Sequence, residues 1–148
     1  MDDNTQFLKA ILQQDWDSYD ALVAGFERQG KGTPAAIIGF AFNLAVQRRF
    51  GQNRDLDGII RFVAETRTFL SEGRDLPAKD AEALICATLD MDLPGVAETI
   101  DRLDIGTITE IEGQLLFKLV SDENLSQQEL DDFLLQAEAL AEQWQNQA

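Results

Sequence analysis

The sequence of 148 residues contains no histidine, one cysteine and three prolines. Without histidine the chain lacks the most common general base, which excludes sites where histidine activates a serine or a cysteine. Zinc sites with histidine ligands and histidine-ligated di-iron bundles are excluded for the same reason. Cys86 has no second cysteine to pair with, so no internal disulfide or cysteine-rich metal site forms. These absences argue against a conventional enzyme and favour a reducing compartment.

Long hydrophobic runs are also missing. The longest mostly apolar stretch, Ala35 to Val46, spans 12 residues and contains Gly39 and Asn43. A membrane-spanning helix needs about 20 apolar residues. The first residues are acidic and polar, whereas a signal peptide begins with a basic segment followed by an apolar one. We therefore expect a cytoplasmic protein without a signal peptide or a membrane segment.

Basic residues are scarce and unevenly distributed. The chain has 12 Lys and Arg residues but 27 Asp and Glu residues, which gives a formal net charge of −15. Residues 1–27 carry −5, residues 28–79 carry +4, and residues 80–148 carry −14. This surplus of negative charge disfavours direct binding to nucleic acid and to anionic membranes. It favours encounter with a basic partner.

The spacing of apolar residues is helical along nearly the whole chain, and no segment alternates as a strand does. The sequence therefore predicts an all-α fold, with 1–148 as a single domain formed by a bundle of about six or seven helices. Helix 34–50 is apolar almost all round, so we expect it to be the buried centre of the bundle. The expected helical segments are about 5–28 in two pieces, 34–50, 55–71, 78–90, a short segment after Pro94, a segment from Thr109, and a last one ending near Trp144.

Local signals predict several helix boundaries. Thr33-Pro34 has the form of a helix start, with a capping threonine and a proline in the first turn. Ile105-Gly106 predicts a break, and capping boxes are predicted at Thr109–Glu112 and at Ser126–Glu129. A loop is predicted at 71–75. In the last helix Trp144 continues the apolar stripe, so we expect it to pack in the core.

One concentrated basic cluster, Arg48, Arg49 and Arg54, lies near the junction of two predicted helices, and Arg61 and Arg67 extend it. Two interpretations remain open. In the first, Arg48 and Arg49 complement a helix C-terminus and pair with the acidic C-terminal half of the chain. In the second, Arg48, Arg49 and Arg54 form a docking patch for an acidic partner.

Two pairs of carboxylates, Glu98 with Asp101 and Glu129 with Asp132, each share one face of a predicted helix. If the two helices packed together, the four carboxylates would offer hard oxygen ligands for Mg²⁺. A chain with 27 acidic residues also produces such pairs by chance, on a solvated face. A twelve-residue calcium loop starting at Asp90 is disfavoured by the proline that falls at one of its ligand positions.

The sequence alone does not identify a reaction or a ligand. It predicts a small acidic interaction or regulatory module without catalysis and without a cofactor, whose partner is a protein, a basic one by charge. One alternative is an acidic mimic of nucleic acid that regulates a basic partner. The other is a Mg²⁺-dependent nucleotide hydrolase built on the four paired carboxylates. Self-association remains open.

Overall fold

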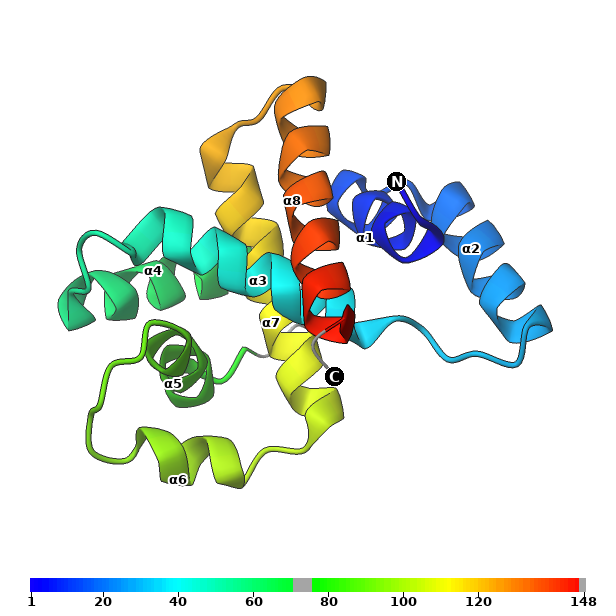
Figure 1. The fold of residues 1–148 in the computed structure, drawn as a ribbon. Coiled ribbons are helices and arrows are strands. Elements are labelled where there is room, and N and C mark those ends of the chain that lie inside the picture. Colours follow the sequence, from blue (N-terminus) through cyan, green and yellow to red (C-terminus); the bar gives the residue numbers. More distant parts are fainter. Residues whose placement is uncertain (71–75, 147–148) are drawn as a thin grey trace. The chain divides into compact units, whose positions relative to one another are not determined.

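The computed structural model describes residues 1–70 and 76–146, and within them the chain forms eight α-helices and no strand. The all-α prediction is confirmed, while the expected count of six or seven helices is too low. The predicted loop at 71–75 lies outside the described residues. The helices are α1 (Asp3–Gln13), α2 (Trp16–Arg28), α3 (Ala35–Phe50), α4 (Leu56–Phe69), α5 (Ala78–Thr88), α6 (Val96–Asp101), α7 (Ile105–Glu123) and α8 (Gln127–Asn146) (Figure 1).

The chain divides into two compact units. The first consists of Met1–Ala41 and Asn124–Ala148, and the second of Phe42–Glu123. The boundary falls inside α3, so this helix contributes residues to both units. α3 is buried along one stripe rather than on all sides, because Asn43, Arg48 and Arg49 are exposed. The buried stripe consists of Ile37, Ala41, Phe42, Ala45, Val46 and Phe50.

In the first unit, aspartate caps start the first two helices. Asp2 accepts a hydrogen bond from the Thr5 N–H at 2.8 Å, and Asp15 accepts one from the Ser18 N–H at 3.3 Å. These bonds satisfy backbone donors that a helix start leaves without a partner. Gln14 ends α1 in the left-handed conformation, with φ at 56°. The first apolar segment of the sequence, which was expected in two pieces, therefore forms two separate helices, α1 and α2.

The core of the first unit is partly aromatic. The Phe7 ring on α1 stacks on Tyr19 at 5.2 Å between centroids and meets the Phe26 ring edge-on at 5.9 Å. α1 also packs against α8, where Lys9 forms an ion pair with Asp131 at 2.7 Å. α8 contributes its apolar face to this unit through Leu130, Phe133, Leu134 and Ala137, all buried.

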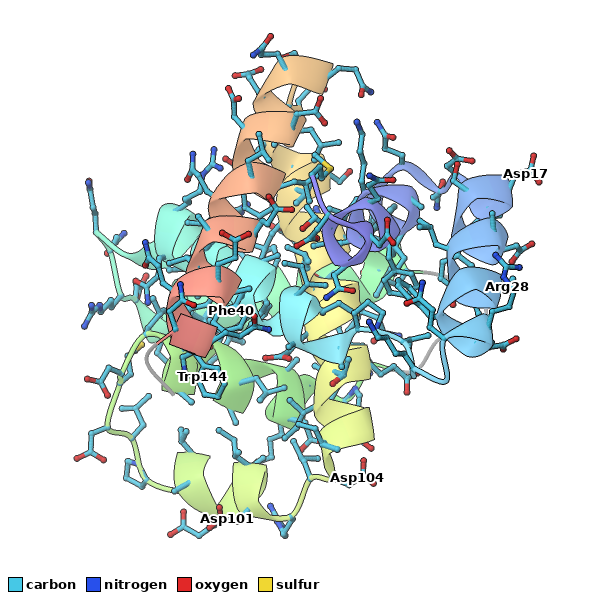
Figure 2. The ribbon with its side chains drawn as sticks, turned by 45° about the vertical axis from the view of Figure 1, so that its right-hand side comes forward. Asp17, Arg28, Phe40, Asp101, Asp104 and Trp144 are labelled. Atoms are coloured by element: carbon cyan, nitrogen blue, oxygen red, sulfur yellow. The ribbon has the colours of Figure 1, made fainter. Side chains whose placement is uncertain are left out.

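The expectation that Trp144 packs in the core is wrong. Its side chain is 63% exposed, and it contacts Phe40, whose ring centroid lies 6.3 Å away (Figure 2). The apolar stripe of α8 is buried only as far as Ala137, and Leu140 is already exposed. Helical spacing identifies the face of a helix but not how far its neighbours extend.

Two predicted boundaries are confirmed. The Ser126 N–H donates to Glu129 Oε1 at 2.9 Å, and the Glu129 N–H donates to Ser126 Oγ at 3.1 Å, which is a complete capping box. α3 ends at Phe50, and Gly51 follows. A Cβ atom at Gly51 would lie 2.3 Å from the Gln47 carbonyl oxygen, so glycine is required at this close approach.

The predicted break at Ile105-Gly106 and the capping box at Thr109–Glu112 are wrong. α7 already begins at Ile105, because the carboxylate of Asp104 accepts the Thr107 N–H at 2.7 Å and caps the helix there. The Thr109 hydroxyl donates back to the Ile105 carbonyl at 2.9 Å, as threonine does inside a helix.

In the second unit, α5 packs against α4, α6 and α7, and α4 packs against α7. The Gln47 side-chain amide donates to the Thr88 carbonyl at 2.9 Å and ties α3 to the end of α5. Cys86 is buried on α5, and this burial, aided by the charge of Glu82, raises the pKa of its thiol. The thiol is therefore a core group, as its position in an apolar segment predicts. No helix among the described residues is both long and apolar enough to cross a membrane.

Candidate functional site

One hollow in the second unit is an acidic groove, formed by the end of α5, the loop that follows it, and α6. It has a volume of about 870 Å³ and is lined by residues between Ala87 and Asp101. Four of the lining residues are carboxylates, and none is basic: Asp90, Asp92, Glu98 and Asp101. The remaining lining is largely apolar, with Met91, Leu93, Val96 and Ile100 half-buried. The groove therefore combines negative charge with an apolar surface.

Two residues with positive φ set the path of the loop that forms this groove. Asp90 has φ at 59° and ends α5, and the next N–H, that of Met91, donates to the Cys86 carbonyl at 2.9 Å. This is the usual way in which a helix end reverses the chain. Gly95 has φ at 88° just before α6, a conformation that glycine adopts without steric cost. The loop backbone thus places carboxylates and apolar side chains along one groove.

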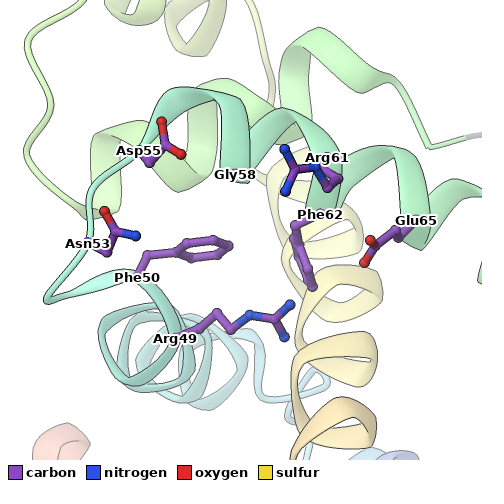
Figure 3. Close-up of a pocket in the computed structure, with 8 residues that line it drawn as sticks. All are labelled: Arg49, Phe50, Asn53, Asp55, Gly58, Arg61, Phe62 and Glu65. Atoms are coloured by element: carbon purple, nitrogen blue, oxygen red, sulfur yellow. The ribbon is translucent and has the colours of Figure 1, made fainter.

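Another, smaller hollow is an arginine pocket of about 340 Å³ between the end of α3 and α4 (Figure 3). Phe50 and Phe62 form its wall, with ring centroids 5.7 Å apart and the rings edge to face. The Arg49 guanidinium lies over both rings, 5.1 Å from the centroid of Phe62 and 5.8 Å from that of Phe50. Its lining consists of Arg49, Phe50, Asn53, Asp55, Gly58, Arg61, Phe62 and Glu65.

The basic cluster is divided between internal pairing and the surface. Arg48 pairs with Glu123 at 2.9 Å, and Arg49 pairs with Asp122 at 3.1 Å, both acidic residues at the end of α7. These contacts fit the interpretation that Arg48 and Arg49 pair with the acidic C-terminal half. Arg54 is exposed and forms no ion pair with any described residue.

Asp122 is the shared anion of this region, because Lys118 also pairs with it, one turn earlier on α7. Burial acts to raise the pKa of Asp122, but the hydrogen bonds from Lys118 and Arg49 outweigh it and hold the pKa below its ordinary value. The Lys118 ammonium lies 5.1 Å from the centroid of the Phe69 ring. Arg49 is therefore held in place by a network and not only by its own side-chain preferences.

The four carboxylates singled out as Mg²⁺ ligands fall on two helices that belong to different units. Glu98 and Asp101 lie on α6 in the second unit, and Glu129 and Asp132 lie on α8 in the first. Within the described part of each unit, neither pair is joined by a third potential ligand. Glu129 moreover accepts the Ser126 N–H in the capping box of α8. Asp101 is exposed on α6 (Figure 2).

One group of three carboxylates was not predicted. Asp2, Glu138 and Glu142 each have an oxygen within 4.8 Å of the others. The Thr5 hydroxyl lies 2.7 Å from Asp2 Oδ1 and 3.0 Å from Glu138 Oε1. Burial acts to raise the pKa of Asp2, but the hydrogen bonds from Thr5 outweigh it and hold this pKa below its ordinary value. The i,i+4 spacing of Glu138 and Glu142 is visible in the sequence, whereas their proximity to Asp2 depends on how α1 packs on α8.

Comparison of the chain with protein-family profiles, with curated proteins and with solved structures gave no match. The acidic groove and the arginine pocket are thus the features from which a function is inferred.

Proposed function

We propose that the chain is a non-catalytic interaction module that binds a basic, partly apolar segment of a protein partner in the acidic groove. The observation that supports this proposal is the composition of the groove, which offers four carboxylates, no basic residue and an apolar lining. Lys and Arg side chains match such a surface well, because an apolar stem carries the charged group. A basic segment with interspersed apolar side chains is complementary to both parts of the lining.

The charge of the chain strengthens this match. Residues 80–148, which include the groove, carry a net charge of −14. A field of this sign concentrates cationic partners near the surface and raises their association rate. The volume of about 870 Å³ is sufficient for several side chains of a docked segment. Long-range attraction of this kind is screened by salt, so binding should weaken steeply as ionic strength rises.

The experiment measures the binding of a fluorescein-labelled peptide of alternating arginine and leucine by fluorescence anisotropy, at low and at high salt. A groove variant removes the four charges of the lining, and a matched control removes four exposed acidic residues of the first unit. The groove variant is Asp90→Asn, Asp92→Asn, Glu98→Gln and Asp101→Asn. The control is Asp17→Asn, Asp20→Asn, Glu27→Gln and Asp132→Asn, all exposed.

We expect the groove variant to lose at least about tenfold in affinity and the control to lose less than about threefold. Equal losses in the two variants would mean that the peptide responds only to the overall charge, and the proposal would be wrong. Unchanged binding in the groove variant would exclude the groove as the docking surface. Circular dichroism of both variants checks that the helical content is retained.

A further inference from the structure

The arginine pocket brings two guanidinium groups to one hollow from different helices. Figure 3 shows Arg49, at the end of α3, and Arg61, on α4, lining the pocket from different helices, with the rings of Phe50 and Phe62 forming part of its wall. Asn53 adds a side-chain amide from the connection between the two helices. The pocket therefore offers several N–H donors around one space.

The two arginines differ in how they are held. Arg49 is positioned by its ion pair with Asp122 and by the ring faces of Phe50 and Phe62. A guanidinium has five N–H donors, so this single ion pair leaves donors for a ligand. Arg61 is exposed and forms no ion pair with the described residues. One donor group is thus preorganised, and the other is available to close on a ligand.

We infer that the arginine pocket binds a small organic carboxylate between Arg49 and Arg61. The planar guanidinium matches a carboxylate with two parallel hydrogen bonds. The volume of about 340 Å³ lies at the lower end of the range for small-molecule sites, which favours a small ligand over a protein segment. Asp55 and Glu65 also line the pocket and oppose a second negative charge, so a monoanion fits better than a phosphate dianion. This site is independent of the acidic groove.

The probe is benzoate, whose flat ring and single carboxylate match a pocket with two phenylalanine rings. Binding is followed by shifts of backbone amide signals in ¹H–¹⁵N NMR spectra of the full chain. Benzamide, the neutral analogue of the same shape, and inorganic phosphate form the two comparison arms. Arg61→Gln is the test variant. Arg67→Gln is the matched control, because Arg67 is exposed on the same helix but does not line the pocket.

We expect benzoate to shift the amides of the lining residues and Arg61→Gln to weaken this binding about tenfold or more, since a charged hydrogen bond is lost. Arg67→Gln should change the affinity less than about twofold. Gly58→Leu is a second variant, which keeps both arginines but fills the pocket, since a Cβ atom at Gly58 meets only Asp55 at ordinary contact distance. Gly58→Leu should also abolish the binding of benzoate.

Any one of four results would overturn the inference. Benzamide could bind as tightly as benzoate, phosphate could bind more tightly than benzoate, or the two arginine variants could lose affinity equally. Absence of any shift at the lining residues would overturn it as well. Binding of the arginine-leucine peptide in the acidic groove is measured in parallel and should be unaffected by Gly58→Leu, so failure of one site is distinguished from failure of the other.

Discussion

Replacement of Glu112 with glutamine should stabilise the protein at neutral pH. Glu112 is half-buried on α7, between the buried Ile111 and Gln114, and forms no hydrogen bond or ion pair with a described residue. Burial raises the pKa of its carboxyl from 4.5 to about 7, because the charged form loses contact with water. At neutral pH the folded protein therefore holds a carboxylate that would be better solvated in the unfolded chain.

The sign and size of the effect follow from this shift. Between pH 4.5 and about 7 the folded state binds the Glu112 proton more tightly than the unfolded state, so the free energy of unfolding falls as the pH rises. The destabilisation caused by the charged Glu112 carboxyl is absent below pH 4.5 and fully present above about pH 7. The full shift corresponds to at most about 3 kcal/mol. The half-buried carboxyl keeps part of its contact with water, which reduces this cost. We therefore expect the charged Glu112 to lower the free energy of unfolding by about 1–2 kcal/mol.

Urea denaturation of the wild type and of Glu112→Gln, measured from pH 5 to pH 8, tests this reasoning. The series stays above the isoelectric point near 4.1, where the protein would lose its net charge. The variant should gain about 1–2 kcal/mol at pH 8 and less than about half of that at pH 5. Glu110→Gln, at an exposed position on the same helix, is the control and should show no such dependence. A difference independent of pH, or a variant less stable at pH 8, would refute the reasoning.

Two further predictions concern contacts at the ends of α7 and α8. Ser126→Ala removes half of the capping box and should lower the free energy of unfolding, measured by thermal melts, by about 1 kcal/mol. The control is Ser121→Ala, at an exposed position with no capping role. It should change the free energy of unfolding by less than about 0.5 kcal/mol. Asp122→Asn leaves Arg49 and Lys118 without their shared anion, at a cost of about 1 kcal/mol because the groups are partly exposed. The folded-state pKa of Asp122 is lowered, so the stabilisation by its carboxylate is present above the unfolded pKa and is lost as the pH falls through the folded pKa. If Asp122→Asn still destabilised the protein in strong acid, the ion pairs of Asp122 would not be the source of the effect.

The features that the sequence predicted best depend on few neighbouring residues. The capping box at Ser126 and the end of α3 near Gly51 are determined within one helical turn, and both were found. The same local pattern at Thr109 was misleading, because Asp104 caps the helix earlier and Gly106 is tolerated in its first turn. A capping pattern alone cannot show whether a better cap stands one turn before it.

The candidate sites were less predictable because they depend on packing between distant segments. The spacing of Glu98 and Asp101 correctly placed both on one short helix, but it carried no information on the position of Glu129. The acidic groove was missed, although the alternation of Asp90, Met91, Asp92 and Leu93 places charged and apolar residues side by side. Recognising it required the reversal of the chain after α5, which the positive φ of Asp90 creates.

The net charge of −15 gives the two candidate sites different responses to salt. It attracts a basic segment from a distance and repels a small carboxylate, and both long-range effects decay over a screening length of about 8 Å at physiological ionic strength. The bonds between a carboxylate and the guanidinium groups of Arg49 and Arg61 are shorter than this length and are screened much less. Added salt should therefore weaken peptide binding in the acidic groove steeply while it changes benzoate binding in the arginine pocket only slightly. A parallel steep loss at both sites would mean that the surface responds to ions as a whole and that neither hollow acts as a specific site.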